Sequence, residues 1–159
     1  MNRTTGPTRT PDDLLIITGG LAFPEGPIMM EDGSVVVVEI ADGCLTRVAP
    51  DDTKEVIART GGGPNGLATG PDGAIYICNN GGLSWHESEH GLLPERFVEF
   101  GSHKLARIER FDPKTGGLEI LYPVSPGAPM NGPNARILAV TKWQGFMEKN
   151  SFLVRALYQ

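Results

Sequence analysis

The chain has 159 residues, of which 40% are hydrophobic and 21% charged, with 21 Gly, 13 Pro and a formal net charge of -5. This length fits one domain with a hydrophobic core, and the turn-rich composition excludes a disordered chain and a helical bundle in favour of an all-β class. The negative charge and the absence of any Lys/Arg run argue against a phosphate-binding surface, so nucleic acid is not an expected partner.

The N-terminal arm, residues 1–18, contains no segment suited to a membrane. Its apolar run, LLII at 14–17, is far shorter than the roughly 20 residues that a spanning helix needs. Cys44 and Cys78 lie in separate apolar segments and have no close-spaced Cys or His, so both are predicted to be reduced core residues. We therefore expect a cytoplasmic protein with no membrane partner.

The sequence repeats itself at a distance of 40 residues. The tripeptide PEG at 24–26 aligns with PNG at 64–66, and the Asp-Gly pair at 32–33 aligns with that at 72–73. The same shift superposes SVVVVE on AIYICN. Each unit therefore predicts a short strand, an Asp-Gly hairpin turn and a β-branched strand with a polar end.

The third strands of the two units match at a longer distance. Arg47 corresponds to Arg110 at a shift of 63 residues, which indicates a 23-residue insertion in the second unit, at about 82–104. That segment shows neither clean alternation nor a sustained helical period. We expect it to form a loop between the second and third strands.

Units of this size are typical of the four-stranded blades of a β-propeller. The first strand of each blade runs beside the central channel, so residues at its start converge on one axis. Glu25, Asn65 and Asn134 occupy that place in three successive units. Their oxygens predict a site for a hard cation such as Ca²⁺ or Mg²⁺. The alternative is that Glu25 caps a turn and that Pro-Asn-Gly is ordinary turn chemistry; recurrence of the motif favours the cation site.

Two stretches carry a family resemblance. FPEGPIMMEDGSVVVVEIADGCLTRV and GGGPNGLATGPDGAIYICNNGG resemble the opening blades of the SMP-30/gluconolactonase/regucalcin-like family of six-bladed propellers, over about residues 19–134. Members of that family bind one divalent metal in the channel, and many hydrolyse sugar lactones or related esters. The resemblance implies Ca²⁺ as the first choice of cofactor, with Mg²⁺, Mn²⁺ or Zn²⁺ as alternatives.

The resemblance also implies roles for particular residues. Glu25 corresponds to the first-blade metal ligand, and Asn134 stands where the family often has Pro-Asn-Asp, so both are predicted to face the metal. Asn65 is a candidate for substrate or metal contact. Asn79 and Asn80 are candidates for substrate contact, although Asn-Asn-Gly-Gly fits a plain turn equally well. The late-blade Asp that serves the family as a base has no counterpart here, so the catalytic residues are unassigned.

The chain departs from the family in length and at its C-terminal end. Six blades need roughly 270 to 300 residues at this period, whereas residues 19–159 supply two blades and part of a third. No Asp-Gly turn follows residue 134, so 135–159 are predicted to be a divergent tail, as a truncated or frame-shifted gene would produce. An incomplete ring exposes blade faces and edge strands, which predicts instability, aggregation or self-association. Closure of two half rings as a dimer is an alternative that the divergent third unit disfavours, because it spoils the closing surface.

A zinc-protease signature lies within the insertion. His86, Glu87 and His90 satisfy H-E-x-x-H, which binds zinc only when a helix places both histidines on one face. The flanking Gly and Pro residues leave room for about two helical turns, and no apolar face anchors them. We expect a lid or rim loop instead, with adventitious surface metal binding as the alternative. Trp85 either leans over the channel mouth or packs under its own loop.

Two functions are therefore open. One is a metal-dependent hydrolase of sugar lactones or related esters, impaired in this short chain, whose partner is a small lactone or ester. The other is an inactive propeller fragment or a small-ligand or Ca²⁺-binding module without catalysis. The family resemblance favours the first, and the missing late-blade Asp favours the second.

Overall fold

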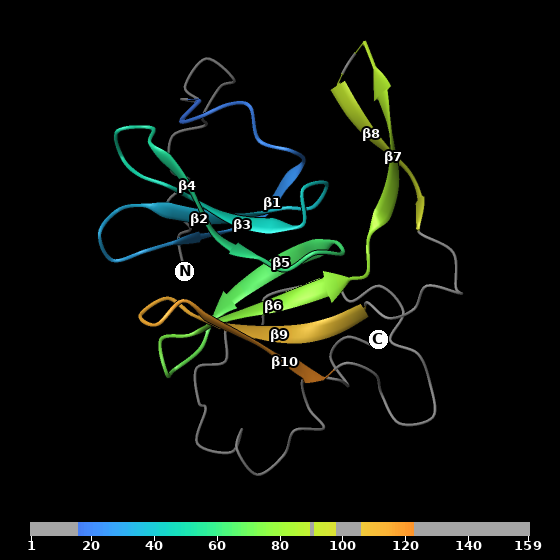
Figure 1. The fold of residues 1–159 in the computed structure, drawn as a ribbon. Coiled ribbons are helices and arrows are strands. Elements are labelled where there is room, and N and C mark those ends of the chain that lie inside the picture. Colours follow the sequence, from blue (N-terminus) through green and yellow to red (C-terminus); the bar gives the residue numbers. More distant parts are fainter. Residues whose placement is uncertain (1–15, 90, 98–105, 123–159) are drawn as a thin grey trace, which may run out of the picture.

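The computed structural model describes residues 16–89, 91–97 and 106–122, and these residues form strands and turns without a helix. Two four-stranded antiparallel sheets lie next to each other (Figure 1). Blade 1 consists of β1 (Pro24–Met29), β2 (Val35–Glu39), β3 (Cys44–Val48) and β4 (Lys54–Arg59). Blade 2 consists of β5 (Pro64–Thr69), β6 (Ile75–Asn80), β9 (Ala106–Asp112) and β10 (Gly117–Tyr122). The predicted all-β fold of four-stranded propeller-type blades is confirmed.

The 40-residue repeat of the sequence is also a repeat of strand register. Pro24 pairs with Glu39 across β1 and β2, and Pro64 pairs with Asn79 across β5 and β6. The residue after Glu39 or Asn79 donates its backbone N–H to a carbonyl just before the first strand. Ile40 donates to the carbonyl of Phe23, and Asn80 donates to that of Gly63. Both first strands carry a register irregularity near their start, between Glu25 and Ile28 in β1 and between Pro64 and Gly66 in β5.

The predicted Asp-Gly hairpin turns are present, and their aspartates bind the arginines of the third strands. In blade 1, Gly33 takes a positive φ of 82° and donates its backbone N–H to the carbonyl of Met30. Asp32 accepts hydrogen bonds from Ser34 and from Arg47. The equivalent Arg110 of blade 2 bonds Asp72 through Nε at 2.9 Å and through Nη2 at 2.7 Å. The Asp-Gly pair and the third-strand arginine, two separate parts of the sequence repeat, thus form one interaction.

The hydrophobic core lies between the two blades. Alternate residues of β2 and β3 face blade 2, and alternate residues of β6 and β9 face blade 1. The cluster consists of Val36, Val38, Ile40, Leu45, Leu67, Ile75, Ile77 and Phe111, each 3% exposed or less. Val36 and Val38 therefore face this core, whereas Val35 and Val37 belong to the other side of blade 1.

The insertion contains a β-hairpin, where the sequence predicted a loop. β7 (Leu83–Ser88) pairs with β8 (Gly91–Phe97) in a separate two-stranded sheet (Figure 1). This hairpin lies between β6 and β9 along the chain, and β6 and β9 themselves are paired neighbours in blade 2. His86 lies on β7, so the segment lacks the helix that the zinc-protease signature requires; residue 90 is outside the described residues. The ring of Trp85 contacts that of Phe23 before β1, with centroids 5.0 Å apart. Trp85 thus packs against the residue that precedes β1 and against the core cluster rather than only under its own hairpin.

Neither cysteine is expected to react with thiol reagents while the protein is folded. Cys44 and Cys78 are free and buried, and burial raises the pKa of both thiols, that of Cys78 to about 11. Because the thiolate is the reactive form, an aromatic disulfide reagent should label neither thiol quickly in native buffer at neutral pH. It should label both in concentrated guanidinium chloride. Fast native labelling of either cysteine would contradict this burial.

Two further expectations concern the membrane and the C-terminal part of the chain. The described segments contain no helix long and apolar enough to cross a membrane. Asn134 and the predicted tail 135–159 lie outside the described residues.

Candidate functional site

The first strands of the two blades approach each other backbone to backbone at the repeated motif. A Cβ atom built on Gly26 of β1 would lie 2.9 Å from the Cα of Gly66 and 3.0 Å from the backbone nitrogen of Leu67 on β5. Gly26 also has a positive φ of 55°. Any side chain at this position would collide with the neighbouring strand, so the glycines of PEG and PNG permit the contact. Glu25 precedes Gly26 and Asn65 precedes Gly66, so the two residues occupy equivalent positions of neighbouring strands.

The predicted metal ligands differ in their surroundings. Glu25 is exposed and lines a groove beside β1. Asn65 is partly buried, and Asn134 lies outside the described residues. No group of three or more His, Cys, Asp or Glu side chains in the described ranges is placed to hold a metal. The structure thus brings Glu25 and Asn65 to neighbouring strands, and the metal role of both stays a prediction.

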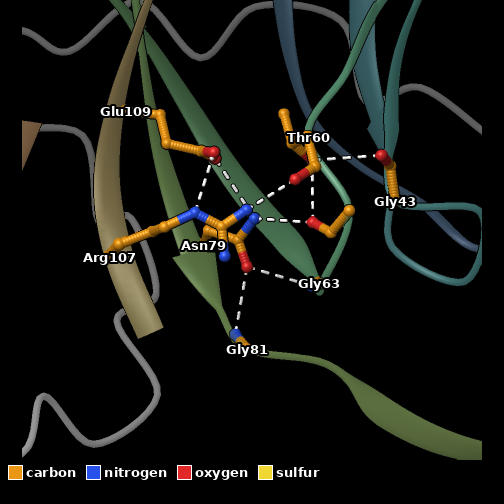
Figure 2. Close-up of polar contacts among 8 residues, drawn as sticks. Gly43, Thr60, Gly63, Asn79, Gly81, Arg107 and Glu109 are labelled. Atoms are coloured by element: carbon orange, nitrogen blue, oxygen red, sulfur yellow. Dashed lines mark hydrogen bonds and ion pairs between the residues drawn. The ribbon is translucent and has the colours of Figure 1, made fainter. Parts of the chain in front are cut away.

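Asn79, a predicted substrate contact, is fully buried and joins blade 2 to the segment between β4 and β5 (Figure 2). Its Nδ2 donates to the carbonyl of Gly61 at 2.8 Å and to Glu109 at 3.1 Å. Its Oδ1 accepts from the backbone N–H groups of Gly63 and Gly81, each at 3.0 Å. Four hydrogen bonds are the full capacity of a carboxamide with two donors and two lone pairs. Asn79 therefore has a structural role in this conformation.

Asn80 follows the same pattern at the strand end. It is 7% exposed, and its Oδ1 accepts a hydrogen bond from the backbone N–H of Gly82 at 2.9 Å. Both asparagines thus bond the backbone two residues ahead, which is the turn chemistry that the sequence offered as the alternative for Asn-Asn-Gly-Gly. Contact of either residue with a substrate stays a prediction.

A buried ion pair completes this cluster, and sequence analysis missed it. Arg107 Nε donates to Glu109 Oε1 at 2.9 Å, with both side chains less than 10% exposed. Arg107 also donates to the carbonyl of Thr60, in the segment between β4 and β5 (Figure 2). The blade 2 strands and the segment that enters from blade 1 are therefore held by charged and amide groups as well as by the core. We refer to Asn79, Arg107 and Glu109 as the blade latch.

Blade 1 has a smaller version of the blade latch at equivalent positions. The shifts of 40 and 63 residues align Glu39 with Asn79 and Thr46 with Glu109. Glu39 is 6% exposed and accepts hydrogen bonds from Thr46 and from the backbone N–H of Ala22, the latter at 2.6 Å. In both units, two adjacent strands each carry one polar residue at these equivalent positions. This recurrence is the sequence signal from which the cluster could have been found.

The contribution of Glu109 to stability is expected to decrease as the pH rises. Burial raises the pKa of Glu109 above its ordinary value of 4.5, against the opposing effects of Arg107 and Asn79. The folded chain therefore retains a proton that the unfolded chain has released, so this contribution is complete below the unfolded pKa. It is lost as the pH rises through the folded pKa.

Urea unfolding of the wild type and of Glu109→Gln at a series of pH values above 4.5 tests this expectation. That range avoids Asp32, Asp51 and Asp72, whose pKa values are lowered and whose contributions are lost in acid. The wild type should lose stability relative to the variant as the pH rises. A difference that does not change with pH would refute the raised pKa.

Comparisons with known proteins place the chain in no family. No protein-family model matches the sequence, and no curated protein matches it. Among solved structures it is similar to one described as "Streptogramin B lyase structure", with 18% sequence identity and a TM-score of 0.34. The match covers 77% of this chain and 45% of that chain, so the present chain spans less than half of the neighbour's length. A similarity this low bears on neither fold nor activity, and the fold assignment rests on the two blades themselves.

Proposed function

We propose that this chain belongs to a metal-dependent hydrolase of sugar lactones or related esters, of the gluconolactonase type. One observation carries the proposal: the first strands of the two blades meet at Gly26 and Gly66, which directly follow Glu25 and Asn65 in the sequence. The resemblance of the surrounding sequence to the SMP-30/gluconolactonase/regucalcin-like family supports it. Membership of that family is part of the proposal.

The donor set fits a hard divalent cation. Glu25 offers an exposed carboxylate and Asn65 a carboxamide oxygen, which are the ligand types that Ca²⁺ prefers, with Mg²⁺, Mn²⁺ or Zn²⁺ as alternatives. Asn134 is proposed as a third ligand. A cation bound there would supply Lewis-acid polarisation of a lactone carbonyl. Glu25 holds the negative charge that attracts the cation, and Asn65 orients the ligand shell.

A non-catalytic ligand-binding module is the second candidate. The observation that favours it is the full hydrogen-bonding capacity of Asn79, which is spent on Gly61, Gly63, Gly81 and Glu109. A residue that the resemblance offered as a substrate contact thus fixes blade 2 to the segment between β4 and β5. The two candidates make opposite predictions for turnover and the same prediction for ligand binding.

Hydrolysis of glucono-δ-lactone and of an aryl ester, followed with a pH indicator, tests the proposal. The wild type should turn over in Ca²⁺ and lose activity in a chelator. Glu25→Gln should lower kcat/KM by about 100-fold or more, because a metal-bound oxyanion is worth several kcal/mol. Glu31→Gln, in the exposed turn after β1, is the matched control and should leave activity unchanged. A folded wild type without turnover in any divalent metal would favour the non-catalytic module.

A further inference from the structure

The residue that leads into Glu25 has a strained backbone. Phe23 lies two residues before Glu25 and takes a positive φ of 59°. A bulky side chain rarely adopts this left-handed conformation, which costs free energy and persists only where the surrounding structure holds it. The backbone N–H of Phe23 donates to the carbonyl of Leu21 at 3.2 Å, and its carbonyl accepts from Ile40 at 3.1 Å. The chain therefore reaches β1 and Glu25 through a fixed left-handed residue.

Blade 2 fixes the equivalent position by a different contact. The shift of 40 residues aligns Phe23 with Gly63, whose backbone N–H donates to the buried Asn79 of the blade latch at 3.0 Å. In blade 1 the residue equivalent to Asn79 is Glu39, and it accepts from Ala22, one residue before Phe23. Among the described residues, the entry to β1 thus lacks the bond that fixes the entry to β5.

The side chain of Phe23 is held by the hairpin of the insertion. Its ring lies 5.0 Å from that of Trp85 on β7, centroid to centroid, at an interplanar angle of 54°. Tilted aromatic pairs at this separation attract each other beyond the area that they bury. Both rings are partly buried and pack against the core cluster. Blade 1 has no insertion between β2 and β3, and Gly63 has no side chain. Two departures from the repeat therefore meet in this one contact.

We infer that Trp85 is a positioning residue for the proposed cation site: through Phe23 it holds Glu25 where its carboxylate shares a divalent cation with Asn65. This inference rests on the proposed function and assigns a role in it to a residue outside the predicted ligand set. Without the contact, Phe23 relaxes from its left-handed conformation. The apparent affinity for the cation then falls with the fraction of chains in which Glu25 is correctly placed.

Calorimetric Ca²⁺ titration of the wild type, Trp85→Ala and Trp85→Phe tests this role. Trp85→Ala should weaken binding about 10-fold, because a strained residue relaxes when its fixation is removed. Trp85→Phe retains an aromatic ring against Phe23 and should bind within about twofold of the wild type. Ile57→Ala removes an apolar side chain of β4 that packs against the same core. It is the matched control for lost packing and should leave the affinity unchanged.

A double variant shows whether the effect passes through Phe23. Glycine adopts the left-handed conformation without strain, so in Phe23→Gly there is neither a ring for Trp85 to hold nor strain for it to offset. Addition of Trp85→Ala should therefore change the Ca²⁺ affinity of Phe23→Gly by less than about twofold. A loss of about 10-fold in that background would mean that Trp85 acts by another route and would overturn the inference.

Hydrogen exchange of the wild type is a second measurement, which needs no variant of Trp85. If the contact raises the affinity for Ca²⁺, bound Ca²⁺ stabilises the contact by the same factor. The amide groups of β7 should therefore exchange up to about 10-fold more slowly in saturating Ca²⁺, and those of β4 should change less. In Glu25→Gln, Ca²⁺ should leave β7 unaffected. Unchanged exchange in β7 of a wild type that binds Ca²⁺ would overturn the inference.

The readouts separate the inference from the proposed function. Ca²⁺ affinities in the expected order without hydrolysis of any lactone would uphold the inference and reject the hydrolase. Hydrolysis together with equal Ca²⁺ affinities of the wild type and Trp85→Ala would overturn the inference and leave the hydrolase standing. A folded wild type that binds none of Ca²⁺, Mg²⁺, Mn²⁺ and Zn²⁺ would overturn both.

Discussion

Replacement of Arg107 by leucine is expected to lower the free energy of unfolding by about 3–5 kcal/mol, because it leaves the carboxyl group of Glu109 buried without its cationic partner. The carbonyl of Thr60 loses a donor in the same change. The bond to Thr60 joins blade 2 to the segment that arrives from blade 1, whereas the bond to Glu109 lies within β9. The loss therefore falls on blade 2 and on its junction with that segment. Chemical denaturation followed by tryptophan fluorescence measures it.

The double variant Arg107→Leu/Glu109→Leu is the control for this prediction. Removal of both charges avoids the uncompensated carboxylate, so the double variant should be more stable than Arg107→Leu alone. Arg47→Leu, which removes an exposed ion pair from the Asp-Gly turn of blade 1, should cost much less. If Arg107→Leu proves no more costly than Arg47→Leu, the blade latch does not hold the blades together.

Gly26→Ala is expected to cost about 2–4 kcal/mol of stability. Its Cβ would lie 2.9 Å from the Cα of Gly66, which forces β1 and β5 apart and adds about 1–3 kcal/mol of overpacking. The positive φ of 55° adds about 1 kcal/mol more. The measured quantity is the free energy of unfolding from urea denaturation.

Gly61→Ala separates the two contributions. Gly61 has a similar φ of 64°, but a Cβ there would meet nothing within 4 Å. This control should therefore lose only about 1 kcal/mol, the cost of backbone strain. Equal losses for the two alanine variants would mean that the first strands do not touch at PEG and PNG.

The blade architecture was predictable because it depends on local sequence patterns. The Asp-Gly turns, the β-branched strands and the two repeat distances each follow from a few neighbouring residues, and the structure realises them in two units with equivalent strand order and turns. The hairpin of the insertion was not predictable, because its strands mix polar residues with Leu83 and Trp85 in no clear alternation. Its anchor, the contact of Trp85 with Phe23, joins residues 62 positions apart.

The candidate site was predictable only in part, for a similar reason. The equivalent positions of Glu25 and Asn65 in the two first strands follow from the repeat, and the structure shows that these strands meet at Gly26 and Gly66. The blade latch depends on a pairing across 30 residues between Asn79 and Glu109, which local patterns do not reveal. Self-association through the blade faces and a cytoplasmic location stay predictions.

The most direct test of the proposed site is a calorimetric Ca²⁺ titration of the purified wild-type chain. If Glu25 and Asn65 share a cation, the titration should show one bound ion per chain, with affinity reduced at least about 10-fold in Glu25→Gln and unchanged in Glu31→Gln. The absence of binding heat at millimolar Ca²⁺, or equal affinity in the wild type and Glu25→Gln, would contradict the account.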